Sequence, residues 1–248
     1  MVILNRYVGE SAPDAVLVGS SLTYRLSEAY FSTMRVRNLA LPGGSPVTGL
    51  EVVATRPSLP KFVLVETNVL SRPVDEDLVR KYSNVTDMGP MFLRPIKAAV
   101  AAYENWLHAS PSNLQIALSL DRLLNEPPSD FDNRGYLKRA LQEANSEDPE
   151  PATKKNVEEI KSLVASIEYR GPKVLLFELP HAPEIEAAKF ARVTRSIVHA
   201  AFPDSTRWLR MKVPREELRW PDGVHLDERS ALLIARSIEQ GLSVGKKH

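Results

Sequence analysis

Apolar and polar positions follow two different periods along this chain. Five short runs are rich in aliphatic residues, and three of them are almost continuously apolar, which is typical of strands buried on both faces of a parallel sheet. The expected strands are residues 15–19, 35–40, 62–66, 174–178 and, with the weakest pattern, 206–210. Helical spacing of apolar residues fills the intervals between them. This alternation predicts an α/β fold: a three-layer α/β/α sandwich around a mostly parallel five-stranded sheet.

The helical segments differ in how clearly they end. Three helices have clear patterns, at residues 157–167, 183–201 and 227–240. The first of these patterns stops at Gly171-Pro172, and the last begins at Asp227, a suitable N-cap. A long interval separates the third strand from the fourth, with helical patterns at 95–108 and 113–124 and loop-like composition at 125–130 and 145–151. We interpret residues 74–152 as a helical insertion or cap within one domain of residues 1–248.

Composition narrows the chemistry. The chain has 248 residues, of which 43% are hydrophobic and 25% charged, as in an ordinary globular protein. Its 32 Lys and Arg against 31 Asp and Glu give a net charge of +1, so no basic excess suggests a nucleic-acid partner. The absence of cysteine excludes disulfides, cysteine nucleophiles and thiolate metal sites. No apolar run approaches the roughly 20 residues that a membrane helix needs.

Residues that could carry chemistry follow the expected strands, at the edge where open α/β sheets bind ligands. Ser21 follows the first strand, where a tight turn can expose its hydroxyl as a nucleophile. His225 is a candidate base, and Asp222, three residues earlier, is close enough in sequence to orient its imidazole. Gly43 can offer an unobstructed backbone N–H, and Asn68 a side-chain amide, to a developing oxyanion.

These residues fall in four blocks that resemble those of the SGNH hydrolases, the superfamily also called GDSL esterases and lipases. Gly19-Ser20-Ser21-Leu22 resembles its Gly-Asp-Ser-Leu block, Asn38-Leu-Ala-Leu-Pro-Gly43 its second block, Glu66-Thr67-Asn68 its Gly-x-Asn block, and Asp222-Gly-Val-His225 its Asp-x-x-His block. The resemblance implies a flavodoxin-like fold and a catalytic triad of Ser21, His225 and Asp222. It also implies an oxyanion hole formed by the N–H groups of Ser21 and Gly43 and the amide of Asn68. The expected insertion lies outside the resemblance.

Two positions depart from these blocks. Ser20 stands where the family has aspartate, as in the subgroup of SGNH-like proteins that handle acyl groups on bacterial surface polysaccharides and are often membrane-anchored and periplasmic. Glu66 stands where the family has glycine. Because Glu66 lies two residues before Asn68 in an extended run, we expect both side chains on one face. Glu66→Gly is then expected to raise activity by removing a negative charge near the oxyanion.

Three residues are expected to contact substrate: Glu66, His181 and Trp220. Structural roles are the alternatives, with Ser21 as a helix N-cap, Asp222 as part of a local turn, His181 as a pocket-lining or capping residue and Trp220 as core. Glu178 and His181 are spaced like a helical metal pair, but they follow a strand and Pro180 intervenes, so we expect no metal site there.

The blocks together predict a serine esterase that hydrolyses small, acetyl-like esters on carbohydrate through an acyl-enzyme, without metal or organic cofactor. The alternatives are an O-acyltransferase of polysaccharide with the same triad and a non-catalytic glycan-binding or assembly protein. The expected ligand is a small acyl ester or an acylated carbohydrate. The resemblance favours a periplasmic or extracytoplasmic location with a membrane-associated partner, and a cytoplasmic location is the alternative.

Overall fold

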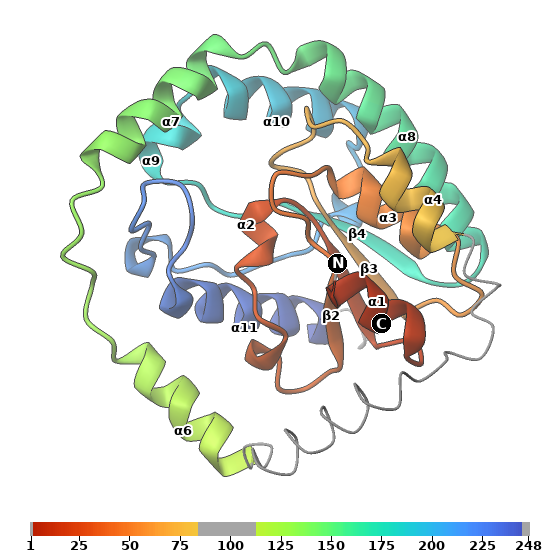
Figure 1. Cartoon of the computed structure of the whole chain (residues 1–248), viewed down its shortest axis with the longest axis horizontal. Helices are drawn as coiled ribbons and strands as arrows, with labels where there is room; N and C mark the ends of the chain where they lie inside the picture. Colours follow the sequence, from red (N-terminus) through yellow and green to blue (C-terminus); the bar gives the residue numbers. More distant parts are fainter. Residues whose placement is uncertain (1, 84–112, 245–248) are drawn as a thin grey trace, which may run out of the picture.

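The computed structural model describes residues 2–83 and 113–244. Their centre is an open sheet of four parallel strands in the order β2-β1-β3-β4 (Figure 1). The strands are β1 (Ala15–Val18), β2 (Val36–Asn38), β3 (Phe62–Glu66) and β4 (Lys173–Phe177). Each lies within the expected run or one residue outside it, because continuous apolar runs mark strands that are covered on both faces. The α/β class and the parallel sheet are therefore confirmed.

The expected fifth strand at residues 206–210 is not formed as a strand. Residues Ser205–Arg207 instead form the 3-10 helix η3, and Trp208 makes a single parallel bridge to Leu176 of β4. Asp204 explains the difference, because its side chain accepts hydrogen bonds from both the backbone N–H (2.8 Å) and the hydroxyl (2.7 Å) of Thr206. This local capping competes with strand pairing, which leaves one backbone bond from Leu209 to Leu176.

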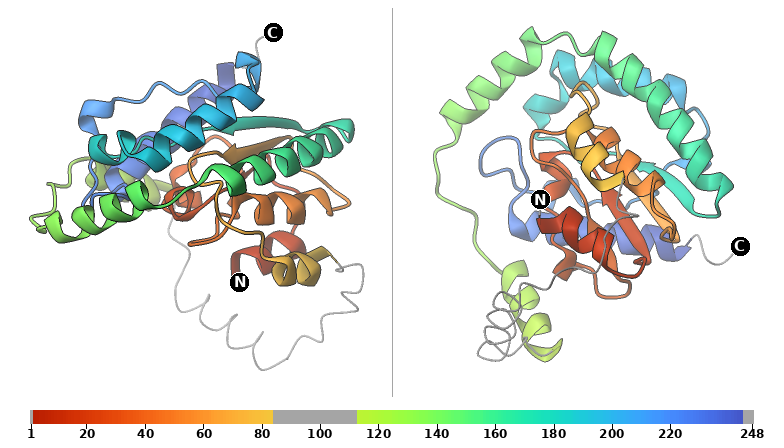
Figure 2. Two further views of the ribbon diagram at one scale, coloured as in Figure 1. Left: turned by 90° about the horizontal axis from the view of Figure 1, so that it is seen from above. Right: turned by 45° about the vertical axis from the view of Figure 1, so that its right-hand side comes forward.

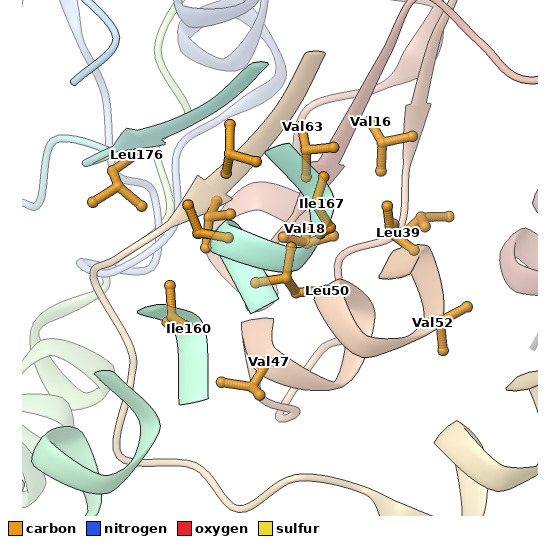
Figure 3. Close-up of a cluster of buried hydrophobic side chains, with 14 of the residues drawn as sticks. Val16, Val18, Leu39, Val47, Leu50, Val52, Val63, Ile160, Ile167 and Leu176 are labelled. Carbon is orange, nitrogen blue, oxygen red and sulfur yellow. The ribbon is translucent and has the colours of Figure 1, made fainter. Parts of the chain in front are cut away.

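Helices cover both faces of the sheet. Alternate strand residues such as Val16, Val18 and Val63 pack against α3 (Pro46–Ala54) and α8 (Glu150–Tyr169) (Figure 3). The same side receives α1 (Val2–Gly9) and α10 (Lys189–Ala201). On the opposite face, residues such as Leu17 and Leu64 pack against α11 (Glu228–Val244). The strand period of two thus assigns neighbouring residues to two separate cores.

Most of the expected helices are present, with changed boundaries; α11, for example, ends at Val244 and not at residue 240. The 157–167 pattern lies inside α8, and the chain turns at Gly171, whose φ of 108° suits glycine. The 183–201 segment divides into α9 (Pro183–Glu186) and α10, with Ala188 as the N-cap of the latter. Asp227 caps α11 as expected, because its side chain accepts the backbone N–H of Ser230 at 2.7 Å.

The expected insertion contributes three described helices: α4 (Glu76–Ser83), α6 (Asn113–Leu124) and α7 (Arg134–Ser146). The helix expected at 95–108 lies outside the described residues. α4 packs on α3, whereas α6, the following linker and α7 run along the periphery (Figures 1 and 2). No helix among the residues described has the length and apolar content to cross a membrane.

Candidate active site

The polar strand ends meet between β1 and β3. The chain leaves β1 for β2 on one side, while β3 lies on the other side of β1. A ligand-binding crevice forms at such a switch point, outside the carboxyl ends of the strands. Ser21 follows β1 directly after the turn at Gly19-Ser20, and Glu66 is the last residue of β3.

The turn after β1 assigns different roles to two neighbouring serines. Ser20 is the N-cap of the short helix α2 (Ser21–Tyr24), because its hydroxyl accepts the backbone N–H of Leu22 at 3.2 Å. Ser21 is the first residue of α2, and its hydroxyl is free to contact a group outside the helix. The capping role that was the alternative for Ser21 therefore belongs to Ser20.

Ser21, His225 and Asp222 form one continuous hydrogen-bonded chain. The Ser21 Oγ lies 2.9 Å from Nε2 of His225, and Nδ1 of the same ring lies 2.8 Å from Oδ2 of Asp222. The serine and the histidine are 204 positions apart in the sequence, and the fold brings their reactive atoms within hydrogen-bond distance. This is the geometry by which a carboxylate orients an imidazole and the imidazole activates a hydroxyl.

Local backbone bonds hold the Asp222 carboxylate in place. Its Oδ1 accepts the backbone N–H of Val224 at 2.9 Å and that of His225 at 2.7 Å. Partial burial would raise the pKa of Asp222, but these backbone bonds and the contact with the His225 ring hold the pKa below its ordinary value. Asp222 therefore makes the local turn and faces the imidazole as an anion at the same time.

The loop that carries His225 is supported by α7. Gly223 has a φ of 80° and approaches α7 so closely that an added Cβ would lie 2.8 Å from Cβ of Leu137. Asn133, the N-cap residue of α7, donates its side-chain amide to the Trp220 carbonyl at 3.1 Å. The Trp220 indole N–H donates to the Pro180 carbonyl at 3.2 Å, so the ring is fixed between this loop and the end of β4.

Two of the three expected oxyanion donors have a free N–H. Ser21 is at the first position of α2, where a backbone N–H has no partner within the helix, and no other described group accepts from it. Gly43 sits in a turn with a φ of 72°, and its N–H likewise has no acceptor among the described residues. The backbone bond from Leu41 to the Gly19 carbonyl, 2.9 Å, joins this turn to the end of β1.

Asn68 is engaged with the end of β4 instead. Its Oδ1 accepts the backbone N–H of Leu179 at 2.7 Å, while its Nδ2 lies 2.8 Å from the Leu179 carbonyl and 3.0 Å from Nε2 of His181. Both amide hydrogens therefore have partners, and one of them would have to leave His181 before Asn68 could bind an oxyanion.

His181 is buried beside Asn68. Burial lowers the pKa of this histidine to about 4, so the ring is neutral near pH 7. A neutral ring that accepts from Asn68 at Nε2 carries its proton on Nδ1, and this buried Nδ1 has no partner among the described residues. The structure thus places His181 next to a predicted donor, in contact with Asn68.

The side chains of Glu66 and Asn68 do not lie on one face, so that expectation is wrong. The strand ends at Glu66, so the alternation of side chains does not continue to Asn68. The Glu66 carboxylate points toward β1 and accepts from Ser20 and Thr23, whereas Asn68 points toward the end of β4. Burial raises the pKa of Glu66, and hydrogen bonds from Thr23 and Ser20 act against that rise.

Two residues to which the sequence analysis assigned no role also shape the turn. Thr23 donates its hydroxyl to Glu66 at 2.6 Å. Asn38, at the end of β2, donates its side-chain amide to the carbonyls of Thr23 (2.7 Å) and Leu26 (2.8 Å). The available signal for Asn38 was the type of residue, since it is an amide at the carboxyl end of a strand.

Comparison with known proteins adds no family assignment, because neither the known protein-family models nor the curated proteins include a match to this chain. Within residues 2–83 and 113–244, no group of three or more His, Asp or Glu side chains is arranged to hold a metal ion.

Proposed function

We propose that this protein is a serine esterase that hydrolyses small acyl esters, with Ser21 as nucleophile, His225 as general base and acid, and Asp222 as the orienting carboxylate. The observation that carries the proposal is the chain of contacts of 2.9 Å from Ser21 to His225 and 2.8 Å from His225 to Asp222. The order β2-β1-β3-β4 is compatible with the doubly wound order 2-1-3-4-5, and the resemblance to the SGNH blocks supports the same assignment.

The proposed mechanism begins when Ser21 Oγ attacks the ester carbonyl while Nε2 of His225 accepts its proton. Asp222 stabilises the imidazolium, and the free N–H groups of Ser21 and Gly43 donate hydrogen bonds to the developing oxyanion. His225 then donates the proton to the leaving alcohol oxygen, which leaves an acyl group on Ser21. Water attacks that ester with His225 again as base, which releases the acid and regenerates the hydroxyl. Asn68 stays a predicted third donor.

A carbohydrate alcohol is the leaving group that we propose, in line with the resemblance. The surface beside the His225 loop supports it, because Phe131 and Tyr136 are exposed by 54% and 63% and their ring centroids lie 5.6 Å apart. They flank Asn133, which contacts Trp220. Exposed aromatic rings offer flat apolar faces on which sugar rings can pack. Transfer of the acyl group to a sugar hydroxyl, and glycan binding without catalysis, stay alternatives.

Turnover of a chromogenic acetyl ester tests the proposal. Ser21→Ala should abolish turnover with little change in the midpoint of thermal unfolding, because among the described residues the hydroxyl hydrogen-bonds to His225 alone. Ser27→Ala is the matched control, since Ser27 lies six residues further on and caps the short helix η1 (Glu28–Tyr30) at the surface. Turnover that survives Ser21→Ala would remove Ser21 from the mechanism. Acetylated sugars should compete with the chromogenic ester if the leaving group is a carbohydrate.

A further inference from the structure

One buried carboxylate lies under the nucleophile turn and has no part in the mechanism above. The side chain of Glu66 is completely buried. It accepts the backbone N–H of Ser20 at 2.7 Å and the Ser20 hydroxyl at 2.8 Å. From the other side it accepts the hydroxyl of Thr23 at 2.6 Å and, more weakly, the Thr23 N–H at 3.3 Å. Ser21 lies between these two residues in the sequence.

The hydrogen-bond chemistry of this cluster suits a carboxylate. Two of the four groups that face Glu66 are backbone N–H groups, which can only donate, and the other two are hydroxyls that donate to it; an ionised carboxylate has only acceptors. A glutamine that keeps its oxygen at the Oε2 position would turn its NH₂ group toward the Ser20 hydroxyl, which would then accept at that position instead of donating. The turn also has to lie close to the carboxylate, because a Cβ added to Gly19 would lie 2.6 Å from Glu66 Oε2 and 2.4 Å from Thr23 Oγ1.

The helix that presents Ser21 depends on outside support. α2 has four residues, and a helix of one turn is unstable without tertiary contacts. Ser20 connects Glu66 to α2, since its hydroxyl donates to Glu66 and accepts the N–H of Leu22. Glu66 holds Ser20 and Thr23 from beneath α2, and Asn38 holds the carbonyl of Thr23.

We propose that Glu66 is a positioning residue that fixes Ser21 for attack by ordering Ser20 and Thr23 on either side of it. This inference rests on the proposed function, in which Ser21 is the nucleophile. It replaces the expectation that Glu66 opposes catalysis, so Glu66→Gly should lower activity rather than raise it.

The test uses a unique thiol as a probe of Ser21. The chain contains no cysteine, so Ser21→Cys introduces the only thiol, next to Nε2 of His225. A thiol paired with imidazole ionises below the ordinary cysteine value of about 8.5 and reacts faster with iodoacetamide near pH 7. Adding Glu66→Gln to this protein should slow alkylation roughly tenfold and shift the pH profile back toward that ordinary value.

Two further variants separate positioning from a general loss of stability. Thr23→Val keeps the side-chain shape but removes the 2.6 Å bond, so it should slow alkylation in the same direction and to a smaller extent. Ile167→Val, on the buried face of α8, should lower the unfolding midpoint without slowing alkylation. If Glu66→Gln and Thr23→Val unfold no earlier than Ile167→Val and react at the parent rate, the positioning role is wrong.

Moving the carboxylate from position 66 to position 20 tests whether the rate of alkylation can be restored. Glu66→Gly combined with Ser20→Asp returns a carboxylate to the turn from the opposite side, and alkylation should recover relative to Glu66→Gly alone. Failure to recover in a protein that folds would count against the proposal. The thiol experiment is independent of esterase activity: a chain that hydrolyses no ester but alkylates in a Glu66-dependent way would overturn the proposed function and support the positioning role.

Discussion

Asp222→Asn is the substitution for which the structure makes the sharpest prediction. Oδ1 of Asp222 accepts two backbone N–H groups, from Val224 and His225, so an asparagine must keep its carbonyl oxygen at that position. Its NH₂ group then faces Nδ1 of His225, where Oδ2 lies 2.8 Å away in the natural chain. Nδ1 can only accept from this donor, so the ring proton moves to Nε2.

The wrong tautomer removes the base. With its proton on Nε2, His225 donates to Ser21 and has no lone pair there to accept the serine proton. The corresponding change in serine proteases lowers the catalytic constant by roughly 10⁴-fold, and we expect a loss of that order. It corresponds to about 5 kcal/mol of activation free energy. The free energy of unfolding should change little, because asparagine keeps both backbone bonds.

The assay is the catalytic constant for hydrolysis of a chromogenic acetyl ester, with the unfolding midpoint measured in parallel. Asp227→Asn is the matched control: it changes the same atoms five residues away, and asparagine caps a helix as well as aspartate does. Its turnover should stay close to that of the natural chain. If Asp222→Asn keeps more than a tenth of the natural turnover, Asp222 does not set the tautomer of His225, and the reasoning fails.

Three other substitutions test the surrounding structure. Gly19→Ala should destabilise the fold by roughly 1–3 kcal/mol and reduce turnover, because its Cβ would lie within 2.6 Å of Thr23 and Glu66. Urea unfolding measures the loss of stability, and an unchanged free energy of unfolding would show that the turn relaxes around the added Cβ. Asn68→Ala should lower the catalytic constant by roughly 100- to 1,000-fold with little effect on the Michaelis constant, and near-full turnover would show that it is no oxyanion donor. Because burial lowers the pKa of His181 from 6.5 to about 4, unfolded chains bind more protons between these values, and stability falls as pH drops through that window. His181→Gln should remove up to about 3 kcal/mol of that dependence, and identical pH profiles of the two proteins would refute it.

Much of the sheet could be predicted because short apolar runs in the sequence mark its strands. Residues 62–66 form β3 with the predicted bounds, since a continuous apolar run has few other stable environments. The segment at 206–210 has the weakest apolar pattern of the five, and it begins in the 3-10 helix η3 because Asp204 offers the backbone of Thr206 an alternative partner. Whether a side-chain cap or strand pairing forms depends on the positions of the partner groups in the fold, which the pattern of apolar residues does not contain.

The candidate site was predictable to the extent that it depends on strand ends. Ser21 follows β1 at the ligand-binding edge of the sheet, and Asp222 and His225 are neighbours in one loop. The strand expected before that loop is not formed, so the meeting of the loop with Ser21 depends on packing beyond the strand pattern. The directions of Glu66 and Asn68 could not be read in the same way. The strand stops at Glu66, and beyond a strand end the two-residue alternation no longer determines where a side chain points.

Covalent labelling with a serine-directed fluorophosphonate tests the central claim most directly. The reagent should modify the folded protein at one site, and mass analysis of its peptides should place the phosphonyl group on Ser21. Ser21→Ala should abolish labelling, and Ser27→Ala should not affect it. A folded protein that resists the reagent, or that carries the label on another residue, would contradict the proposal that Ser21 is an activated nucleophile.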